Sequence, residues 1–243
     1  MKKTILLTVL LLGAAVASLA QTLPVTGTFI NLPYQDVRNK YTNPEGVDGT
    51  DPQMWAAKVA EMSEMGMEYL VFMSVANECK AYYPSKLMDW HYPADRQSPV
   101  DAIMDEAAKH GMKVFMSTGW AKDQDDNLRD PKIKGRQIEM MTELARIYGR
   151  HPAMYGWYLP VEDCFGPVLS DYAVDAVNAL TAKARELTPG KKILISPYGI
   201  FNSDFLFFFF SKARLDALDS VNGNLLDFIF CLVECVFSLG WAC

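Results

Sequence analysis

The sequence lacks any run of lysine or arginine, and its formal net charge is −6. A protein that binds nucleic acid through the phosphates needs clustered basic residues, so we expect no nucleic-acid partner. Histidine is also scarce: His91, His110 and His151 lie far apart and do not form the i, i+4 pairs of helical metal sites. No G-x-G-x-x-G phosphate turn follows the first expected strand. We therefore expect neither a metal nor another cofactor.

Cysteine is sparse, and the count of five is odd. If the chain is exported, Cys79 could pair with Cys164, or Cys231 with Cys235. The spacing leaves these alternatives open.

The N-terminus has the pattern of an export signal. Lys2 and Lys3 precede an uncharged apolar stretch over residues 4–17, and Ser18 and Ala20 are small residues at the positions that a signal peptidase reads. The stretch is too short for a typical membrane span. We expect cleavage near Ala20 and a secreted or periplasmic protein, with a buried N-terminal helix as the alternative.

Apolar segments alternate with helical patterns between residues 27 and 197. Strands are expected over residues 27–32, 67–75, 112–118, 153–159 and 192–196, and helices are expected to begin near residues 51, 98, 130 and 171. Apolar strands that alternate with helices predict parallel βαβ units. The fold class is thus α/β, a (β/α)8 TIM-barrel type that is incomplete, with about five to six βα units. A doubly wound sheet is the alternative.

The composition changes after residue 200. Residues 205–210 read FLFFFF without amphipathic periodicity, and Asp227 and Glu234 interrupt a second apolar stretch, which argues against a stable membrane span. We divide the chain into a signal peptide (1–20), the N-terminal part of a barrel (21–200) and a divergent apolar tail (201–243). Because eight strands are needed to close such a barrel, truncation or a frame shift is one explanation of the tail.

Polar and aromatic residues follow the ends of the expected strands, where parallel barrels gather their chemistry. Amides and carboxylates hydrogen-bond sugar hydroxyls, and aromatic faces stack on pyranose rings. Taken singly, the amides also suit turns, Trp120 and Tyr198 suit the barrel core, and Glu78 suits a solvated loop. The predicted sugar-binding residues are Asn31, Asn77, Trp120, Trp157, Tyr158 and Tyr198.

Glu162 is the strongest catalytic candidate. It follows the segment MYGWYLPV, so Trp157, Tyr158 and neighbouring loops could desolvate its carboxylate and raise its pKa, as a general acid requires. Asp163 is interpreted as a loop or helix-side charge. Glu78 is the only early candidate for a second carboxylate.

Three segments carry a family resemblance: HPAMYGWYLPVED at 151–163, GTFINLPY at 27–34 and ISPYG at 195–199. Over residues 27–200 the chain resembles a bacterial family of exported, glycoside-hydrolase-like barrels of formally unknown function. The resemblance implies a TIM barrel and a fourth-strand glutamate, here Glu162, at the acid/base position of a large clan of retaining glycosidases. Residues 201–243 depart from that family's pattern of later strands and a late acidic residue.

The leading hypothesis is an exported protein that cleaves glycosidic bonds of an oligo- or polysaccharide, with Glu162 as general acid/base. The alternatives are a non-catalytic sugar-binding barrel and an inactive truncated or frame-shifted product. The sequence makes no prediction of oligomeric state.

Overall fold

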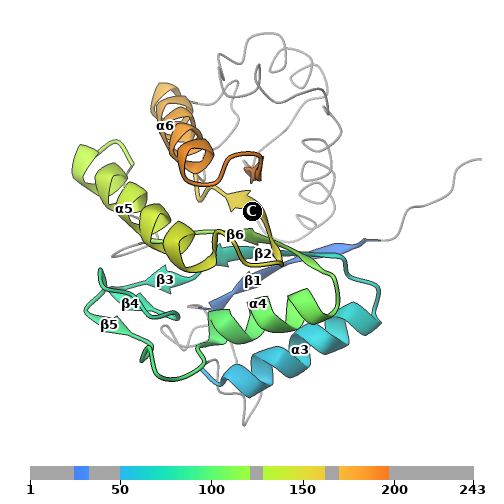
Figure 1. Cartoon of the computed structure of the whole chain (residues 1–243). Helices are drawn as coiled ribbons and strands as arrows, with labels where there is room; N and C mark the ends of the chain where they lie inside the picture. The colour runs from blue at the N-terminus through green and yellow to red at the C-terminus, as the bar shows by residue number, and fades with distance from the viewer. Residues whose placement is uncertain (1–24, 33–49, 121–127, 162–169, 197–243) are drawn as a thin grey trace, which may run out of the picture.

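The structure, a computed structural model, describes residues 25–32, 50–120, 128–161 and 170–196. Its centre is a five-stranded sheet in the order β1-β2-β6-β7-β8, with every neighbouring pair parallel. Helices follow the strands in the chain and pack on the outside of the sheet (Figure 1). The strands of this sheet are β1 (Gly27–Asn31), β2 (Tyr69–Ser74), β6 (Lys113–Met116), β7 (Met154–Tyr158) and β8 (Lys192–Leu194); the helices are α3 (Pro52–Glu64), α4 (Pro99–Lys109), α5 (Pro131–Tyr148) and α6 (Asp171–Leu187).

This architecture confirms the predicted fold class, an incomplete α/β barrel of the TIM type. Within the described residues the five strands form an open sheet, with β1 and β8 at its two edges. Every expected strand and helix of the βα series is present.

The helices begin where the sequence places a capping residue. Asp51 accepts a hydrogen bond from the backbone N–H of Gln53 at 2.9 Å, and Asp130 accepts one from Lys132 at 2.8 Å. Ser98 and Asp101 form a reciprocal capping box at the start of α4. In all three helices proline occupies the first turn, where its missing N–H removes no hydrogen bond.

The sheet is strongly curved. The rings of Phe29 on β1 and Tyr158 on β7 meet edge to face with centroids 5.5 Å apart. Two strands lie between β1 and β7, so a flat sheet would separate them by about 14 Å. Tyr69 and Tyr155 likewise meet at 5.8 Å across β6. These rings define a concave face, which corresponds to the interior of a barrel.

The convex face carries the main core. Leu70 and Phe72 on β2, and Val114 and Met116 on β6, are fully buried. They belong to one apolar cluster that includes Ile103 of α4. Burying such side chains contributes about 1.5–3 kcal/mol each, so the helix-covered face holds the sheet together.

The segment between β2 and α4, residues 75–98, departs from the βα series, and we call it the excursion. Three two-residue strands, β3 (Ala76–Asn77), β4 (Lys80–Ala81) and β5 (Trp90–His91), form a second sheet in that order. This sheet is not predictable from the sequence, because two-residue strands are too short to show alternation.

Glu143 of α5 anchors the excursion. Its buried carboxylate accepts hydrogen bonds from the hydroxyl groups of Tyr83 (3.1 Å) and Ser85 (2.6 Å) and from the backbone N–H of Lys86 (2.6 Å). Burial and the adjacent Glu143 charge raise the pKa of Tyr83. The excursion is therefore fixed to α5 as well as to the end of β2.

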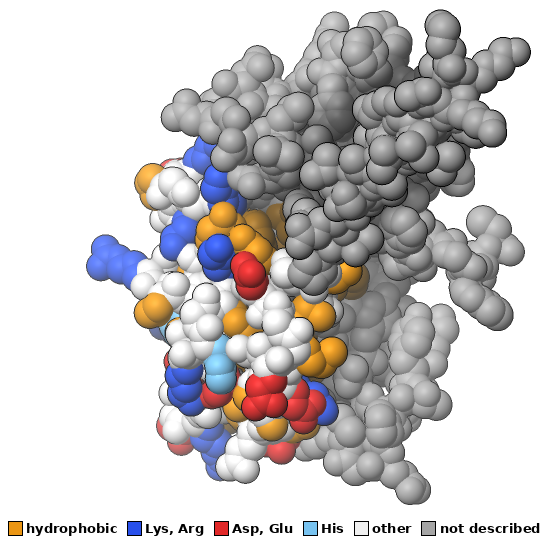
Figure 2. Space-filling view, turned by 90° about the vertical axis from the view of Figure 1, so that its right-hand side faces the viewer, with side chains coloured by type: hydrophobic (Ala, Val, Ile, Leu, Met, Phe, Trp, Pro, Cys, Tyr) orange, Lys and Arg blue, Asp and Glu red, His pale blue; other side chains and the backbone are white. Residues whose placement is uncertain are grey.

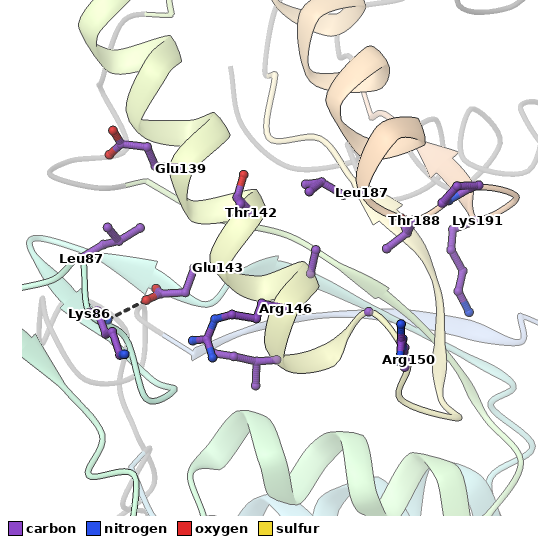
Figure 3. A pocket seen from close by; sticks show the side chains of 14 residues that line it. Lys86, Leu87, Glu139, Thr142, Glu143, Arg146, Arg150, Leu187, Thr188 and Lys191 are labelled. Atoms are coloured by element: carbon purple, nitrogen blue, oxygen red, sulfur yellow. Dashed lines mark hydrogen bonds between the residues drawn. The ribbon is translucent and has the colours of Figure 1, made fainter.

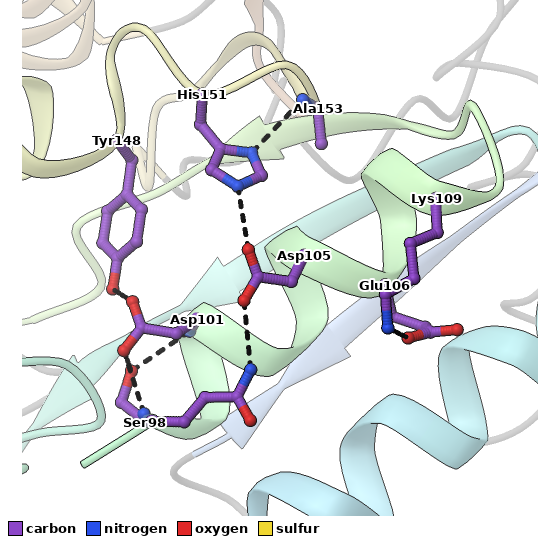
Figure 4. A network of polar contacts seen from close by, with 9 residues as sticks. Ser98, Asp101, Asp105, Glu106, Lys109, Tyr148, His151 and Ala153 are labelled. Carbon is purple, nitrogen blue, oxygen red and sulfur yellow. Dashed lines mark hydrogen bonds and ion pairs between the residues drawn. The ribbon is translucent and has the colours of Figure 1, made fainter.

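A polar network joins α4 to the end of α5 (Figure 4). The Tyr148 hydroxyl donates to Asp101 at 2.7 Å, and a nitrogen of the His151 ring lies 3.3 Å from Asp105. Burial, followed by the Asp101 charge, raises the pKa of Tyr148. The capping box of α4 thus also positions the following βα unit.

On the face shown in Figure 2, basic and acidic side chains are interspersed with apolar ones. Within the part of the chain that the structure describes, no helix combines the length and apolarity needed to cross a membrane.

Candidate functional site

Several predicted residues meet at the carboxyl edge of the curved sheet. We define the strand-end site by Asn31, Ser74, Asn77, Gly119 and Trp120. Asn31 and Ser74 end β1 and β2, Asn77 ends the short β3 that follows β2, and Gly119 and Trp120 lie in the segment after β6. Residues at or after the carboxyl ends of three neighbouring strands thus lie at one edge of the sheet, as expected of parallel strands.

A side-chain hydrogen bond joins the ends of β1 and β2. The Ser74 hydroxyl donates to Oδ1 of Asn31 at 2.8 Å, and Nδ2 of Asn31 lies 3.3 Å from the sulfur of Met73. Asn31 shares the concave face with Phe29, two residues earlier on the strand. Its amide is therefore held in one orientation at the mouth of the concave face.

Gly119 brings the ends of β2 and β6 into close contact. Its φ is +70°, and a Cβ built there would lie 2.4 Å from the carbonyl oxygen of Ala76 and 2.5 Å from Cβ of Ser74. The next residue, Trp120, donates its backbone N–H to the same carbonyl at 3.0 Å. Only glycine fits this approach, and it places Trp120 beside β3.

Gln137 of α5 stabilises this turn through hydrogen bonds. Its Nε2 donates to the carbonyl of Gly119 at 2.7 Å, and its Oε1 accepts from the Thr118 hydroxyl. Both side chains are buried. This polar pair fixes the backbone that carries Trp120.

Asn77 is the least satisfied polar residue of the site. Its side chain is 5% exposed, yet its Oδ1 has no hydrogen-bond partner among the described residues. An unpaired buried acceptor costs about 1–3 kcal/mol, and such groups call for a functional explanation.

Glu78 follows Asn77 in a tight turn. Glu78 and Cys79 both have positive φ, at 50° and 59°, as in the type I′ hairpins that join two antiparallel strands. Glu78 is exposed. Cys79 is the one cysteine among the described residues and carries a free thiol there; the other four cysteines lie outside them.

Tyr158 and Trp157 lie on opposite faces of β7. Tyr158 is on the concave face, where its hydroxyl lies 2.7 Å from Oγ of Ser196. The indole N–H of Trp157 donates to the Thr188 hydroxyl at 2.8 Å, just beyond the end of α6. Adjacent strand residues alternate in direction, so the two predicted sugar-binding residues do not share a site. Trp157 is packed into the convex core and is left out of the strand-end site.

Glu162 and Tyr198 lie outside the described residues, as do Asp163 and Cys164. The last described residue before Glu162 is Val161, which is buried.

A groove lies elsewhere, along α5 (Figure 3). It has a volume of about 1170 Å³ and reaches from Lys86 and Glu143 to the end of α6 at Leu187 and Lys191. It borders the amino ends of β7 and β8, the edge opposite to the strand-end site. In barrels this edge serves stability, so we do not place chemistry there. Among the described residues no group of three or more His, Cys, Asp or Glu side chains is arranged to hold a metal.

A family model described as "Domain of unknown function (DUF4434)" matches residues 25–226. The match extends past residue 200, where the sequence resemblance ended. Comparison with curated proteins gives no match.

Solved structures share the fold. A Bacteroides thetaiotaomicron protein assigned to the α-L-fucosidases has a TM-score of 0.54 and 19% identity, over 74% of this chain and 55% of its own. The endo-1,4-β-D-mannanase of Thermotoga petrophila, crystallised with maltose and glycerol, has a TM-score of 0.51 and 15% identity, over 74% and 57%. The chain thus spans little more than half the length of each. The expectation of a glycoside-hydrolase-like barrel of unknown function is confirmed over part of the chain.

Proposed function

This chain belongs to the DUF4434 family, and we propose that its strand-end site binds an oligo- or polysaccharide and cleaves a glycosidic bond. The solved structures that share its fold carry glycosidase names, and this supports carbohydrate as the substrate class. Such analogy supplies the class of ligand, whereas the chemistry has to come from the residues of the site.

The observation that carries the proposal is the Oδ1 of Asn77, which has no hydrogen-bond partner among the described residues and is buried at the same edge as the oriented amide of Asn31. A sugar hydroxyl is a donor that suits this acceptor. Trp120 and Tyr158 place aromatic rings near the same edge, and both rings are buried. The combination favours an uncharged, hydroxyl-rich ligand over a phosphate.

In the proposed reaction Glu162 is the general acid. Glu162 directly follows Val161 in the sequence, and Val161 is buried beyond the carboxyl end of β7. A carboxyl group that is partly desolvated there would keep its proton at neutral pH. It would donate that proton to the glycosidic oxygen as the C–O bond breaks, leaving the sugar as an oxocarbenium-like centre.

A second carboxylate is needed to complete hydrolysis. It lies about 5–5.5 Å from the acid in retaining enzymes, and about 6.5–9.5 Å in inverting ones. Glu78 is the candidate among the described residues, because its turn adjoins Asn77. In the retaining case it would attack the anomeric carbon, and in the inverting case it would take a proton from the attacking water.

The test compares the chain with Glu162→Gln on a panel of aryl glycosides and oligosaccharides, with Asp163→Asn as the matched control. We expect Glu162→Gln to lower kcat/KM at least a hundredfold, within the range for loss of a general acid, and Asp163→Asn to stay near wild type. Equal rates for wild type and Glu162→Gln would remove the catalytic role of Glu162.

A sugar-binding protein without turnover is the second candidate. The features that favour it are the amides of Asn31 and Asn77 and the ring of Trp120, which need no catalytic pair. Oligosaccharide binding without product, unchanged in Glu162→Gln and weakened in Trp120→Ala, would identify this function.

A further inference from the structure

The excursion sheet aligns three side chains in one row. Asn77 of β3 pairs with Lys80 of β4, and Lys80 pairs with Trp90 of β5. Residues paired across neighbouring strands project from the same face of a sheet. The row therefore starts at the buried amide of the strand-end site and ends at the outermost strand.

Trp90 is exposed at the outer end of this row. Its side chain is 42% exposed, and the ammonium group of Lys80 lies 4.4 Å from the centroid of its ring. Among the described residues, the other large exposed apolar side chains are Val25 and Met65, neither of which is aromatic.

The surroundings of Trp90 hold its ring in place. The rings of Tyr82 and Tyr92 meet it edge to face, at 6.3 and 6.2 Å. Its backbone N–H donates to the carbonyl of Cys79 at 3.1 Å, and the Tyr92 hydroxyl donates to the carbonyl of Thr50 at 3.0 Å. An exposed ring that is fixed in advance loses little entropy when a ligand stacks on it.

The row also has the length of a sugar chain. Neighbouring strands are about 4.8 Å apart, so β3 and β5 are separated by about 10 Å. That span exceeds one pyranose ring. A glycan held at Asn77 could therefore continue along the row and place a later ring on Trp90.

We propose that Trp90 and Lys80 form an outer subsite for the same glycan, so that the site recognises an extended oligosaccharide rather than a single sugar. The aromatic face would stack on the C–H face of a pyranose ring, and the Lys80 ammonium would donate to its hydroxyls. This inference rests on the proposed function, because it assumes that a glycan occupies the strand-end site.

The experiment measures binding separately from turnover. Calorimetric titration of the wild-type chain, Trp90→Ala, Trp90→Phe and Met65→Ala uses manno-, cello- and xylohexaose and the matching disaccharides. Met65→Ala is the control, because this 76%-exposed side chain follows α3 at the opposite edge of the sheet. Thermal unfolding of each variant shows whether the fold is preserved.

We expect Trp90→Ala to weaken binding of the preferred hexasaccharide about tenfold, the loss expected for one buried aromatic contact. The loss should shrink as the sugar chain is shortened, and Trp90→Phe should restore most of the affinity. Met65→Ala should bind like wild type.

Two results would overturn the inference: equal hexasaccharide affinity in wild type and Trp90→Ala, or an equal loss for the hexasaccharide and the disaccharide. Binding that depends on Trp90 but yields no product would support the outer subsite and remove only the proposed hydrolysis. If wild type binds none of the sugars, the subsite and the glycan-binding role both fail.

Discussion

The Ser74 hydroxyl donates a hydrogen bond to Oδ1 of Asn31 at 2.8 Å and so joins the last residues of two adjacent strands. This bond leaves the Asn31 amide in a defined orientation at the edge where we place the glycan. The orientation of Asn31, a predicted site residue, thus depends on Ser74, which is not among the predicted site residues.

Replacing Ser74 with alanine tests this relationship. We expect Ser74→Ala to weaken oligosaccharide binding about fivefold, because a neutral hydrogen bond contributes about 1 kcal/mol. Calorimetric titration measures the change. Ser63→Ala, in the last turn of α3, is the control and should bind like wild type. Unchanged affinity in Ser74→Ala would show that the orientation of Asn31 does not matter.

The close approach at Gly119 gives a second prediction. Gly119 and Gly111 both have φ of +70°, but a Cβ at Gly111 meets nothing within 4 Å, whereas one at Gly119 collides with the end of β2. Gly111→Ala should lower the free energy of unfolding by about 1 kcal/mol, the cost of the left-handed backbone. Gly119→Ala should lower it by about 3 kcal/mol, because steric overlap is added. Urea unfolding compares the two variants, and equal losses would contradict the contact.

Glu143 gives a third prediction. Glu143→Gln can no longer accept all three hydrogen bonds from Tyr83, Ser85 and Lys86. We expect it to lower the free energy of unfolding by about 2 kcal/mol. Glu139, one turn earlier on α5, is exposed, and Glu139→Gln should change it by less than about 0.5 kcal/mol. Equal Tm values for the two variants would show that Glu143 does not anchor the excursion.

Alkaline pH gives a fourth prediction. Burial and the charge of Asp101 raise the pKa of Tyr148 in the folded protein above its ordinary value near 10. Below pH 10 both folded and unfolded states keep the proton, so stability does not change. Above pH 10 the unfolded state loses the proton first, and the free energy of unfolding falls by about 1.4 kcal/mol per pH unit for this group.

Tyr148→Phe removes that contribution. Urea unfolding of wild type and Tyr148→Phe at pH 8 to 11 should show a shallower decline above pH 10 in the variant. Tyr172→Phe, on α6, is the control. It replaces a different tyrosine in the same way, so the ionisation of the remaining lysine and tyrosine side chains affects both variants equally. Parallel curves for wild type and Tyr148→Phe would contradict the raised pKa.

The βα series was predictable because its signals are local and strong. Asp51, Ser98 and Asp130 each precede a proline and cap a helix as expected. The convergence of Asn31, Asn77 and Trp120 on one edge also followed from the sequence, since the carboxyl ends of parallel strands share an edge.

Other features depend on tertiary contacts. Trp157 and Tyr158 were both assigned to the sugar site, yet strand alternation sends only Tyr158 to the concave face. That difference was predictable from the sequence once the strand was assigned, because successive side chains along a strand alternate between its two faces. The burial of Glu143 and the row from Asn77 to Trp90 were not readable, because their partners lie on short strands or loops without periodicity.

The most direct test of the strand-end site is a crystal structure of Glu162→Gln with the oligosaccharide that binds most tightly. We expect a sugar hydroxyl within hydrogen-bond distance of Oδ1 of Asn77 and a later ring stacked on Trp90. A glycan bound instead in the groove along α5, away from Asn31 and Asn77, would contradict the account.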